Sequence, residues 1–356
     1  MEFGIALATA ADSWKIVKRA EELGFSHAWF YDTQMLCADC FVAMGAAAAH
    51  TSRIRLGTGV LIPSNRIAPV TANAFASLNK LAPGRIDFGV GTGFTGRRTM
   101  GLGAMKQSDM EEYIRVVMAL LDEETTEFDI EGQRQKIAFL NPELELINLR
   151  DPVRLHISAY GPRGRALTAR LGAGWLNFVG DVANGAASMQ AMRESWARSG
   201  NDLADLSAVA FALGCVLQPG EAIDGARAMA QAGPRAAVLL HRAADEAMSG
   251  LPNTSPVPPE LVDTVAGYVA LAKRFEPADA RYLANHRGHL MAVKDIERPY
   301  VTADLIRRTT FTAAEPELRD RIAALRDAGY TQFAIQLVPG QEQAIEDWAR
   351  IKAAFA

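Results

Sequence analysis

The sequence contains little of what marks a secreted or membrane-spanning protein. Its 356 residues include only three cysteines, too few for a disulfide framework, and this predicts a reducing compartment. The longest uncharged apolar stretch near the middle, residues 206–217, is about a dozen residues long, whereas a membrane helix needs about 20. The first residues, MEFGIALATAAD, lack the basic segment of a signal peptide. We therefore expect a cytoplasmic protein without a membrane partner.

An excess of basic charge is also missing. Acidic residues outnumber lysines and arginines by 41 to 37, which gives a net charge of −4, and no block of basic residues occurs. Such a chain is poorly suited to bind nucleic acid, so we expect a small-molecule substrate. The apolar fraction of 49% is ordinary for a globular protein and excludes wholesale disorder. Neither a G-x-S-x-G elbow nor a P-loop is present.

Strand and helix patterns alternate along the chain. An apolar run at residues 3–7 precedes an amphipathic segment at 12–23, and the same order repeats at intervals typical of parallel strands joined by crossover helices. The expected strands are residues 3–7, 27–31, 54–60, 86–90, 153–158, 174–178, 207–217 and 331–337. Because eight strands occur without a visible linker, we predict an α/β fold in which residues 1–356 form a single (β/α)8 barrel.

Two segments interrupt the regular series. Residues 126–138 are predicted to form a hairpin that turns at Glu131 and Gly132. A helix is expected at residues 221–231, and residues 234–301 then contain short helical patterns and a proline-rich loop. We predict that residues 234–301 are a helical insertion, or lid, before the last strand.

In a barrel, the loops after the strands form the active site, and two of these loops have chemically suggestive sequences. Residues 91–96 match the dinucleotide pattern G-x-G-x-x-G, but they lie in the fourth unit and do not lead directly into a predicted helix. The glycines would instead let backbone approach a flat ring or a phosphate, with Arg97 and Arg98 as charge partners. A flexible surface loop with solvated arginines is the alternative.

Residues 158–165 lie between the fifth strand of the barrel and its helix. Pro162 is well placed at the start of that helix, where free backbone N–H groups and the helix dipole favour an anion. Ser158, Arg163 and Arg165 reinforce this preference. The segment predicts a phosphate site, and an ordinary strand–helix turn is the alternative.

Two short patterns permit more than one interpretation. His286 and His289 are three residues apart, whereas metal-binding histidines on a helix are usually four apart and need a third ligand. We therefore expect no metal site: one histidine would reach the pocket as a proton donor or orienting group, and the other would be structural. Cys37 and Cys40 have the spacing of a redox motif, but we expect both to pack near the end of the second strand.

Several segments together resemble the bacterial luciferase-like flavin oxidoreductases. They are WFYD at 29–32, SRIRLGTGV at 52–60, LAPGR at 81–85 and GVGTG at 89–93. The loop at 96–101 and the segment at 282–290 are most similar to the methylenetetrahydromethanopterin-reductase-like branch of this superfamily. The resemblance implies a (β/α)8 barrel with an insertion, a flavin or deazaflavin at the carboxyl ends of the strands, and a cis peptide between Gly59 and Val60 that would contact the cofactor ring. The cofactor-binding residues that it implies are Thr58, Gly59, Val60, Gly91, Thr92, Arg97, Ser158, Tyr160, Gly161, Pro162 and Arg163.

One departure from the family pattern concerns the end of the second strand. Many members, notably deazaflavin-dependent ones, have a histidine directly after the aspartate, whereas Thr33 and Gln34 follow Asp32 here. The expected catalytic residues are Asp32, His286 and His289. We expect them to act in positioning or in proton transfer.

The resemblance favours a flavin-dependent monooxygenase, which would use O2 and reduced FMN from a separate flavin reductase to oxygenate a small organic substrate. The first alternative is hydride transfer with coenzyme F-420, whose acidic tail would bind basic groups such as Arg66, Arg97, Lys106 and Arg163. The second is a flavin-binding protein without turnover. By the same resemblance, the chain would form a homodimer or a homotetramer.

Overall fold

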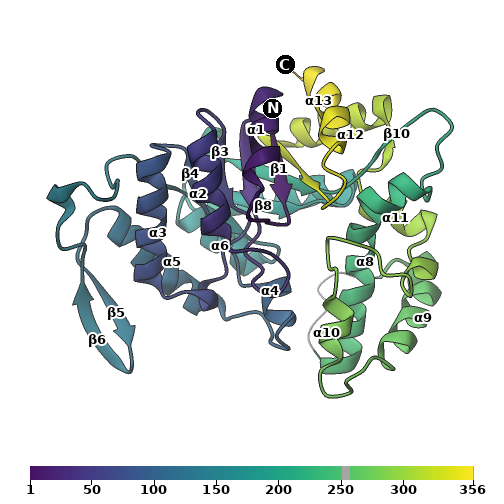
Figure 1. Cartoon of the computed structure of the whole chain (residues 1–356), viewed down its shortest axis with the longest axis horizontal. Coiled ribbons are helices and arrows are strands. Elements are labelled where there is room, and N and C mark those ends of the chain that lie inside the picture. The colour runs from purple at the N-terminus through teal and green to yellow at the C-terminus, as the bar shows by residue number, and fades with distance from the viewer. Residues whose placement is uncertain (251–256, 356) are drawn as a thin grey trace.

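Eight parallel strands close into a barrel at the centre of the molecule, which confirms the predicted (β/α)8 fold (Figure 1). The computed structural model describes residues 1–250 and 257–355. Around the barrel the strand order is β1-β12-β9-β8-β7-β4-β3-β2, so the first and last strands are neighbours. The strands are β1 Glu2–Leu7, β2 His27–Phe30, β3 Arg55–Thr58, β4 Ile86–Val90, β7 Arg154–Ser158, β8 Gly174–Phe178, β9 Ala208–Ala212 and β12 Gln332–Leu337.

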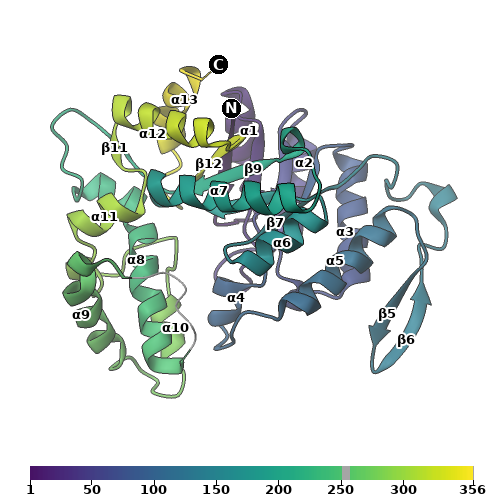
Figure 2. The ribbon, with the colours of Figure 1, turned by 180° about the vertical axis from the view of Figure 1, so that it is seen from behind.

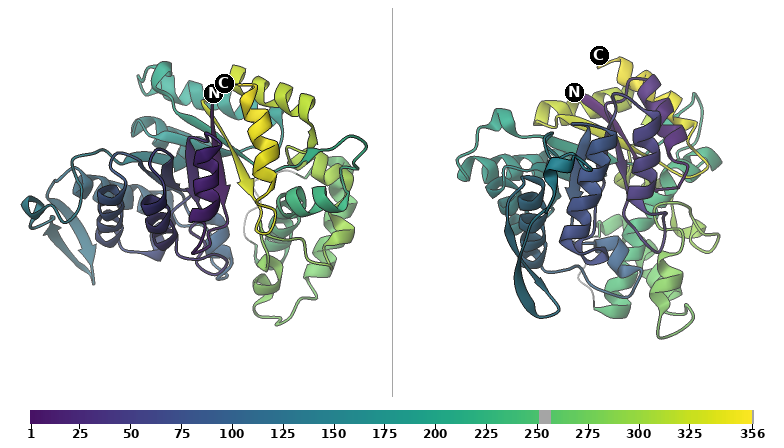
Figure 3. Two further views of the ribbon diagram at one scale, coloured as in Figure 1. Left: turned by 45° about the horizontal axis from the view of Figure 1, so that its top comes forward. Right: turned by 60° about the vertical axis from the view of Figure 1, so that its left-hand side comes forward.

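Helices surround the barrel on its outer face (Figure 2). Their apolar sides pack on the strands, and Asp39 caps one of them by accepting hydrogen bonds from the backbone N–H groups of Phe41 and Val42. Pairing of β1 with β12 brings the two chain ends together, as Figure 3 shows. These helices are α1 Trp14–Glu22, α2 Cys40–His50, α3 Ala68–Leu81, α5 Gln107–Leu121, α6 Pro162–Arg170, α7 Val182–Arg198, α12 Glu315–Ala328 and α13 Ala344–Ala353.

Smaller elements complete the described chain. The predicted hairpin is confirmed, with strands β5 Thr126–Ile130 and β6 Gln133–Ile137. The expected strand at residues 207–217 is wrong in its length, because it ends at Ala212 and a separate two-residue strand follows. The short elements are β10 Val216–Leu217, β11 Ala313–Ala314, α4 Phe94–Arg98 and the 3-10 helices Pro63–Asn65, Pro142–Leu144, Leu203–Asp205, Pro259–Leu261 and Arg298–Tyr300.

The segment before β12 differs most from the sequence-based expectation. Helix α8 (Ala226–Ser249) continues through Pro234, so the predicted end at residue 231 and the predicted start of short helices at 234 are both wrong. Proline disfavours a helix interior, but most of the α8 residues are buried in a second apolar core, which outweighs that preference. The "α8–α11 segment" is the group of α8, α9 (Val262–Ala272), α10 (Arg281–His286) and α11 (Ala303–Thr309), which lies on the opposite side of the molecule from the hairpin (Figure 1).

Close approach of neighbouring strands fixes part of the barrel sequence. A Cβ atom on Gly89 would lie 2.0 Å from the carbonyl oxygen of Thr58, so only glycine fits this position of β4. The hydroxyl of Thr58 in turn donates a 2.7 Å hydrogen bond to the Gly89 carbonyl.

Across the described residues, none of the helices combines the length and the hydrophobicity that a bilayer crossing requires.

Candidate active site

The residues implied for cofactor binding gather at the carboxyl ends of adjacent strands. Strands β7, β4, β3 and β2 are consecutive neighbours in the barrel, and the expected cis peptide between Gly59 and Val60 is present. A Cβ atom on Gly91 would lie 2.8 Å from Val60 Cγ2 and 3.5 Å from Ser158 Cβ. Val60, Gly91 and Ser158 therefore form one surface, where the glycine leaves room beside a half-buried valine.

Some of the implied residues use their polar groups to hold the loops themselves. The Thr58 hydroxyl is bonded within the barrel, and the Thr92 carbonyl accepts a 3.0 Å hydrogen bond from the Met105 backbone N–H. The Nε of Arg97 donates to the Gly103 carbonyl at 2.6 Å, which closes the loop after β4. These contacts indicate that Thr58 and Arg97 shape the loops rather than offer these donors to a ligand.

The amino end of α6 has the features of an anion site. Gly161 precedes the nine-residue helix without a side-chain cap, and Pro162 occupies its first turn, so first-turn N–H groups lack helical partners. A Cβ atom on Gly161 would meet nothing within 4 Å, and the neighbouring Tyr160 and Arg163 are exposed. Space, free donors and a cation therefore occur together, and this arrangement fits the phosphate group of a flavin or deazaflavin.

Asp32 is buried at the end of β2, where several donors surround its carboxylate. Arg66 Nη1 lies 2.9 Å from both of its oxygens, the Ile62 backbone N–H donates at 3.1 Å, and Asn65 Nδ2 donates at 3.2 Å. Arg66 also contacts Asp39 at 2.6 Å. Asp32 thus anchors the loop that follows the cis peptide, which supports the positioning part of its expected role. Because Arg66 is already paired with two carboxylates, it is a poor candidate for binding an acidic cofactor tail.

The structure brings His286 and His289 together and adds a third histidine, His241 of α8. One ring nitrogen from each lies within 4.8 Å of the others, and all three residues are buried. His289 Nδ1 is 2.8 Å from His241 Nδ1 and 3.3 Å from His286 Nδ1. A third potential ligand therefore lies beside the two histidines that the sequence singled out. Sequence reasoning overlooked His241 because it lies 45 residues before His286 and joins it only through helix packing.

Two buried carboxylates hold this histidine cluster, which consists of His241, His286 and His289. Glu297 Oε1 accepts a 2.6 Å hydrogen bond from His241 Nε2, and Asp245 accepts from His286 Nε2 at 3.0 Å. Burial opposes ionisation of Glu297, but the hydrogen bond from His241 and the charge of Lys294 bring its pKa down to about 2. Burial likewise opposes ionisation of Asp245, and His286 and Arg98 lower its pKa. Both carboxylates are therefore ionised at neutral pH.

Several contacts join the histidine cluster to the end of the barrel. Arg98 of α4 forms a 2.7 Å ion pair with Asp245 of α8, and both side chains are only 3% exposed. The Thr95 hydroxyl lies 3.5 Å from His289 Nε2, and Gln336 of β12 donates a 2.7 Å hydrogen bond to the Leu290 carbonyl. Figure 1 shows α4 facing α8 and α10. The cluster therefore lies beside the loops that carry the implied cofactor site.

Two arginines of α8 were not predicted from the sequence. Arg235 lies 5.9 Å from the ring centroid of Phe178 at the end of β8, and Arg242 lies 4.7 Å from that of Phe94. Burial lowers the pKa of Arg242 to about 10 and also lowers that of Arg235. Their spacing of seven residues places both on one face of a helix, but the helix predicted at residues 221–231 ends before them.

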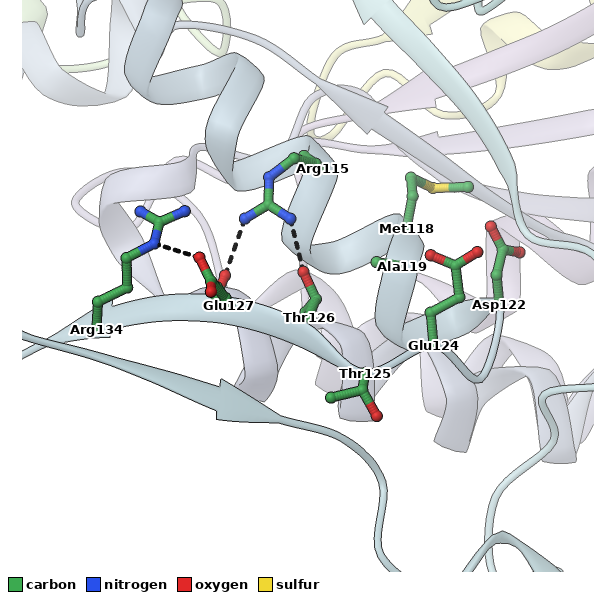
Figure 4. Close-up of a pocket in the computed structure, with 9 residues that line it drawn as sticks. All are labelled: Arg115, Met118, Ala119, Asp122, Glu124, Thr125, Thr126, Glu127 and Arg134. Atoms are coloured by element: carbon green, nitrogen blue, oxygen red, sulfur yellow. Dashed lines mark hydrogen bonds and ion pairs between the residues drawn. The ribbon is translucent and has the colours of Figure 1, made fainter.

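A cavity of about 590 Å³ lies elsewhere, between the end of α5 and the hairpin (Figure 4). Both of its arginines are engaged by other residues of the lining: Arg134 contacts Glu127 at 2.7 Å, and Arg115 donates to the Thr126 hydroxyl at 2.6 Å. None of the residues implied by the sequence lines this cavity. We therefore place the candidate active site at the strand ends and not in this cavity.

The two cysteines of the redox-like spacing are free thiols. Cys40 is buried in the apolar core and Cys37 is half-buried. Burial raises the pKa of Cys37 to about 11 and that of Cys40 well above its usual value, so both thiols are protonated at neutral pH. The expected packing near the end of the second strand is confirmed.

Comparison with known proteins gives a family match and several relatives. The sequence model described as luciferase-like monooxygenase matches residues 4–354. An F-420-dependent glucose-6-phosphate dehydrogenase of Beutenbergia cavernae is 35% identical over 173 residues, which are 46% of this chain and 49% of that protein. The alignment thus spans about half the length of this relative.

Solved structures resemble the chain over nearly its whole length. The coenzyme F-420-dependent tetrahydromethanopterin reductase of Methanopyrus kandleri has a TM-score of 0.68 at 18% identity, with 98% of each chain covered. The oxygenating constituent of 3,6-diketocamphane monooxygenase of Pseudomonas putida, solved with FMN, has a TM-score of 0.64 at 12% identity and covers 99% of this chain and 95% of its own. At these identities the likeness shows the fold alone.

Proposed function

Because the chain belongs to the luciferase-like monooxygenase family, we propose that it is an oxidoreductase that binds coenzyme F-420 and transfers a hydride to or from a small organic substrate. A relative named as an F-420-dependent dehydrogenase supports this choice of cofactor. When bound, the deazaflavin supplies the hydride chemistry. The protein binds and orients the cofactor and the substrate, and it excludes water from them.

The observation that carries the proposal is the collection of cationic and donor groups around the strand ends. Burial lowers the pKa of Arg235, and the phenols of Tyr160 and Tyr31 partly offset this effect. The Nε of Arg235 has no hydrogen-bond partner among the described residues. A half-buried guanidinium of this kind favours an anionic ligand. Together with the uncapped end of α6, Arg235 and Arg163 offer a binding surface for a phosphate and an acidic tail.

The remaining residues have matching positions. Val60, Gly91 and Ser158 would contact the flat ring, and Asp32 would keep the loop of Val60 in place. Lys106 is exposed near α5 and could bind the acidic tail, whereas Arg66 and Arg97 are already engaged within the protein. We propose that residues 234–250 and 257–301 cover the substrate as a lid.

A flavin-dependent monooxygenase that uses FMN is the second candidate. The specific observation in its favour is the sequence after Asp32, where Thr33 replaces the histidine found in many deazaflavin-dependent members. Under this candidate, a separate flavin reductase would supply reduced FMN, and O2 would be the second substrate. A homodimer or homotetramer fits either candidate.

Paired binding titrations test the proposal. Fluorescence of purified protein would be followed with coenzyme F-420, with FMN, and with reduced FMN under anaerobic conditions. We expect selective binding of F-420, and we expect Arg235→Met to weaken it by about 10- to 100-fold, since charged hydrogen bonds contribute about 1.5–3 kcal/mol. Arg198→Met, a change at the exposed end of α7, is the matched control and should leave affinity unchanged.

Each other outcome contradicts a different part of the proposal. Selective binding of FMN or reduced FMN would replace it with the monooxygenase. Tight binding of either cofactor with no turnover of any alcohol, sugar phosphate or ketone would favour a binding protein without catalysis. If none of the three cofactors bound, the assignment of the strand ends as a cofactor site would be wrong.

A further inference from the structure

We propose that His241, His286 and His289 bind one divalent transition-metal ion, for which zinc is the best chemical match. The three residues come from α8, from the end of α10 and from the turn after it. The family match assigns no metal here, and the proposal does not depend on the cofactor, because metal binding can be measured without it.

The hydrogen bonds of the cluster define which ring nitrogens are free. Because Nε2 of His241 and Nε2 of His286 each lie within hydrogen-bond distance of a carboxylate oxygen, these Nε2 atoms are assigned as the protonated ones. In neutral rings, the Nδ1 atoms of these two histidines then carry lone pairs, and both face Nδ1 of His289. All three side chains are buried, where a ring without net charge costs less to desolvate than a charged one.

A neutral trio cannot satisfy all of its own nitrogens. If His289 carries its proton on Nδ1, it can donate to only one of the other two rings, and the remaining lone pair is buried without a donor. If His289 carries its proton on Nε2, three lone pairs converge. In both tautomers, a cation placed where the nitrogens converge would bind the lone pairs that have no hydrogen-bond donor.

The distances agree with nitrogen coordination. Zinc–nitrogen bonds of about 2.0–2.1 Å place tetrahedral ligand atoms about 3.3 Å apart. The Nδ1 atoms of His286 and His289 are 3.3 Å apart, and those of His241 and His289 are 2.8 Å apart, so about half an ångström of widening would bring the second separation to this value. The third pair of ligand atoms lies within 4.8 Å. Imidazole nitrogens without oxygen ligands favour zinc, cobalt, nickel or copper over calcium or magnesium.

The surroundings supply the orienting groups that metal sites need. A metal-binding histidine usually donates its other N–H to a carboxylate, and Glu297 and Asp245 fill this role for two of the three rings. Lys294 pairs with Glu297 at 2.7 Å and Arg98 pairs with Asp245 at 2.7 Å, so the carboxylate and cation charges balance. Arg242 adds one positive charge nearby, which weakens the binding of a divalent cation but leaves its three ligands in place.

Metal binding would replace one role expected from the sequence. An imidazole whose Nδ1 binds a metal and whose Nε2 donates to a carboxylate has no free nitrogen for proton transfer. His286 would then be a ligand rather than a proton donor. The site would hold α8 and α10 together beside Thr95, at the edge of the candidate cofactor site.

The test uses the full-length chain without a histidine tag, stripped with a chelator and titrated with Zn2+ and with Co2+. We expect one Zn2+ per chain by elemental analysis after gel filtration. Co2+ should give the visible absorption of tetrahedral nitrogen coordination, and Zn2+ should abolish it. His289→Ala should lose stoichiometric binding, and Glu297→Gln should weaken it by about 10- to 100-fold.

Two controls keep the result decisive. His50→Ala removes an exposed histidine stacked on Trp14 at the outside of the barrel and should bind Zn2+ like the unaltered chain. Circular dichroism would confirm that the variants fold, and the Co2+ spectrum of the unaltered chain decides the question if His289→Ala does not. Absence of stoichiometric Zn2+, or equal binding by folded His289→Ala, would overturn the proposal and leave a hydrogen-bonded cluster without a metal.

Discussion

The buried histidine at the opposite end of the barrel gives a prediction that can be worked out in full. His27 begins β2, and its Nδ1 accepts a hydrogen bond from Gln332 Nε2 at 2.6 Å and lies 2.8 Å from the Ser26 hydroxyl, which donates to the Phe3 carbonyl. Gln332 cannot turn its amide around, because its Oε1 accepts from Trp29 Nε1 at 2.8 Å. Protonation of Nδ1 would therefore break the hydrogen bond from Gln332 and place one donor against another.

Burial lowers the pKa of His27 to about 4, although Asp87 lies 3.7 Å away and favours the charged ring. In the unfolded chain the pKa of histidine is about 6.5. As the pH falls below 6.5, His27 binds a proton in the unfolded chain, whereas in the folded chain it stays neutral down to about pH 4. The folded state therefore loses stability across this interval. At about 1.4 kcal/mol per pH unit, the loss attributable to His27 reaches about 3 kcal/mol.

Urea denaturation of the unaltered chain and of His27→Gln, measured between pH 7 and pH 4, checks this value. Glutamine can still accept from Gln332 but does not titrate, so the variant should become more stable relative to the unaltered chain by about 2–3 kcal/mol as the pH falls to 4.5. Below pH 4 the folded chain also loses the contribution of Asp87, whose pKa lies below its usual value despite burial because His156 and Arg55 contact it. The difference between the two proteins isolates His27 from this second effect. Parallel pH dependences of the two proteins above pH 4.5 would refute the reasoning, and His50→Gln provides the comparison with an exposed histidine.

Three further substitutions probe the barrel and the contact between its end and the α8–α11 segment. Asp32→Asn should destabilise the fold by about 2–4 kcal/mol in urea, because it removes the buried one of the two carboxylates that pair with Arg66, whereas Asp12→Asn, at an exposed ion pair, should cause no measurable change. Gly89→Ala should abolish soluble folding, since its Cβ would lie 2.0 Å from a carbonyl oxygen, and Gly161→Ala, where a Cβ meets nothing within 4 Å, should be as stable as the unaltered chain. Arg98→Met should destabilise the protein by about 3 kcal/mol and speed proteolytic cleavage of the α8–α11 segment, because it removes one member of a buried ion pair; unchanged cleavage would show that this pair does not hold the segment.

Elements with local signals at both ends were predictable from the sequence. The amphipathic segment at residues 12–23 contains α1, the strand at 174–178 matches β8, and the hairpin turns where glutamate and glycine both adopt positive φ. In each case a turn residue or an amphipathic period defines the element without help from distant residues. The cis peptide between Gly59 and Val60 followed from family resemblance and not from local physics.

The site was less predictable because its parts meet only through tertiary packing. The predicted helix ends at residue 231, before Pro234, but the apolar core around α8 keeps the helix intact to Ser249, about four turns beyond this proline. The same error hid Arg235, Arg242 and His241, which all follow that proline. A helical period that continues past residue 234, with alanines at regular intervals, is the signal that could have found them.

The placement of these groups separates the two tasks of the candidate site. The barrel contributes Val60, Gly91 and Ser158, whose positions depend on strand order and on close backbone approach. We therefore expect them to form the surface that contacts the proposed cofactor ring, whichever substrate is bound. The α8–α11 segment contributes the histidine cluster and two arginines, which are joined to the barrel through a few polar contacts. Substitutions in the barrel loops should therefore change the cofactor that binds, whereas substitutions on α8 beyond the cofactor's reach should change the substrate. A shift of substrate preference on replacing Val60, with cofactor affinity unchanged, would contradict this division.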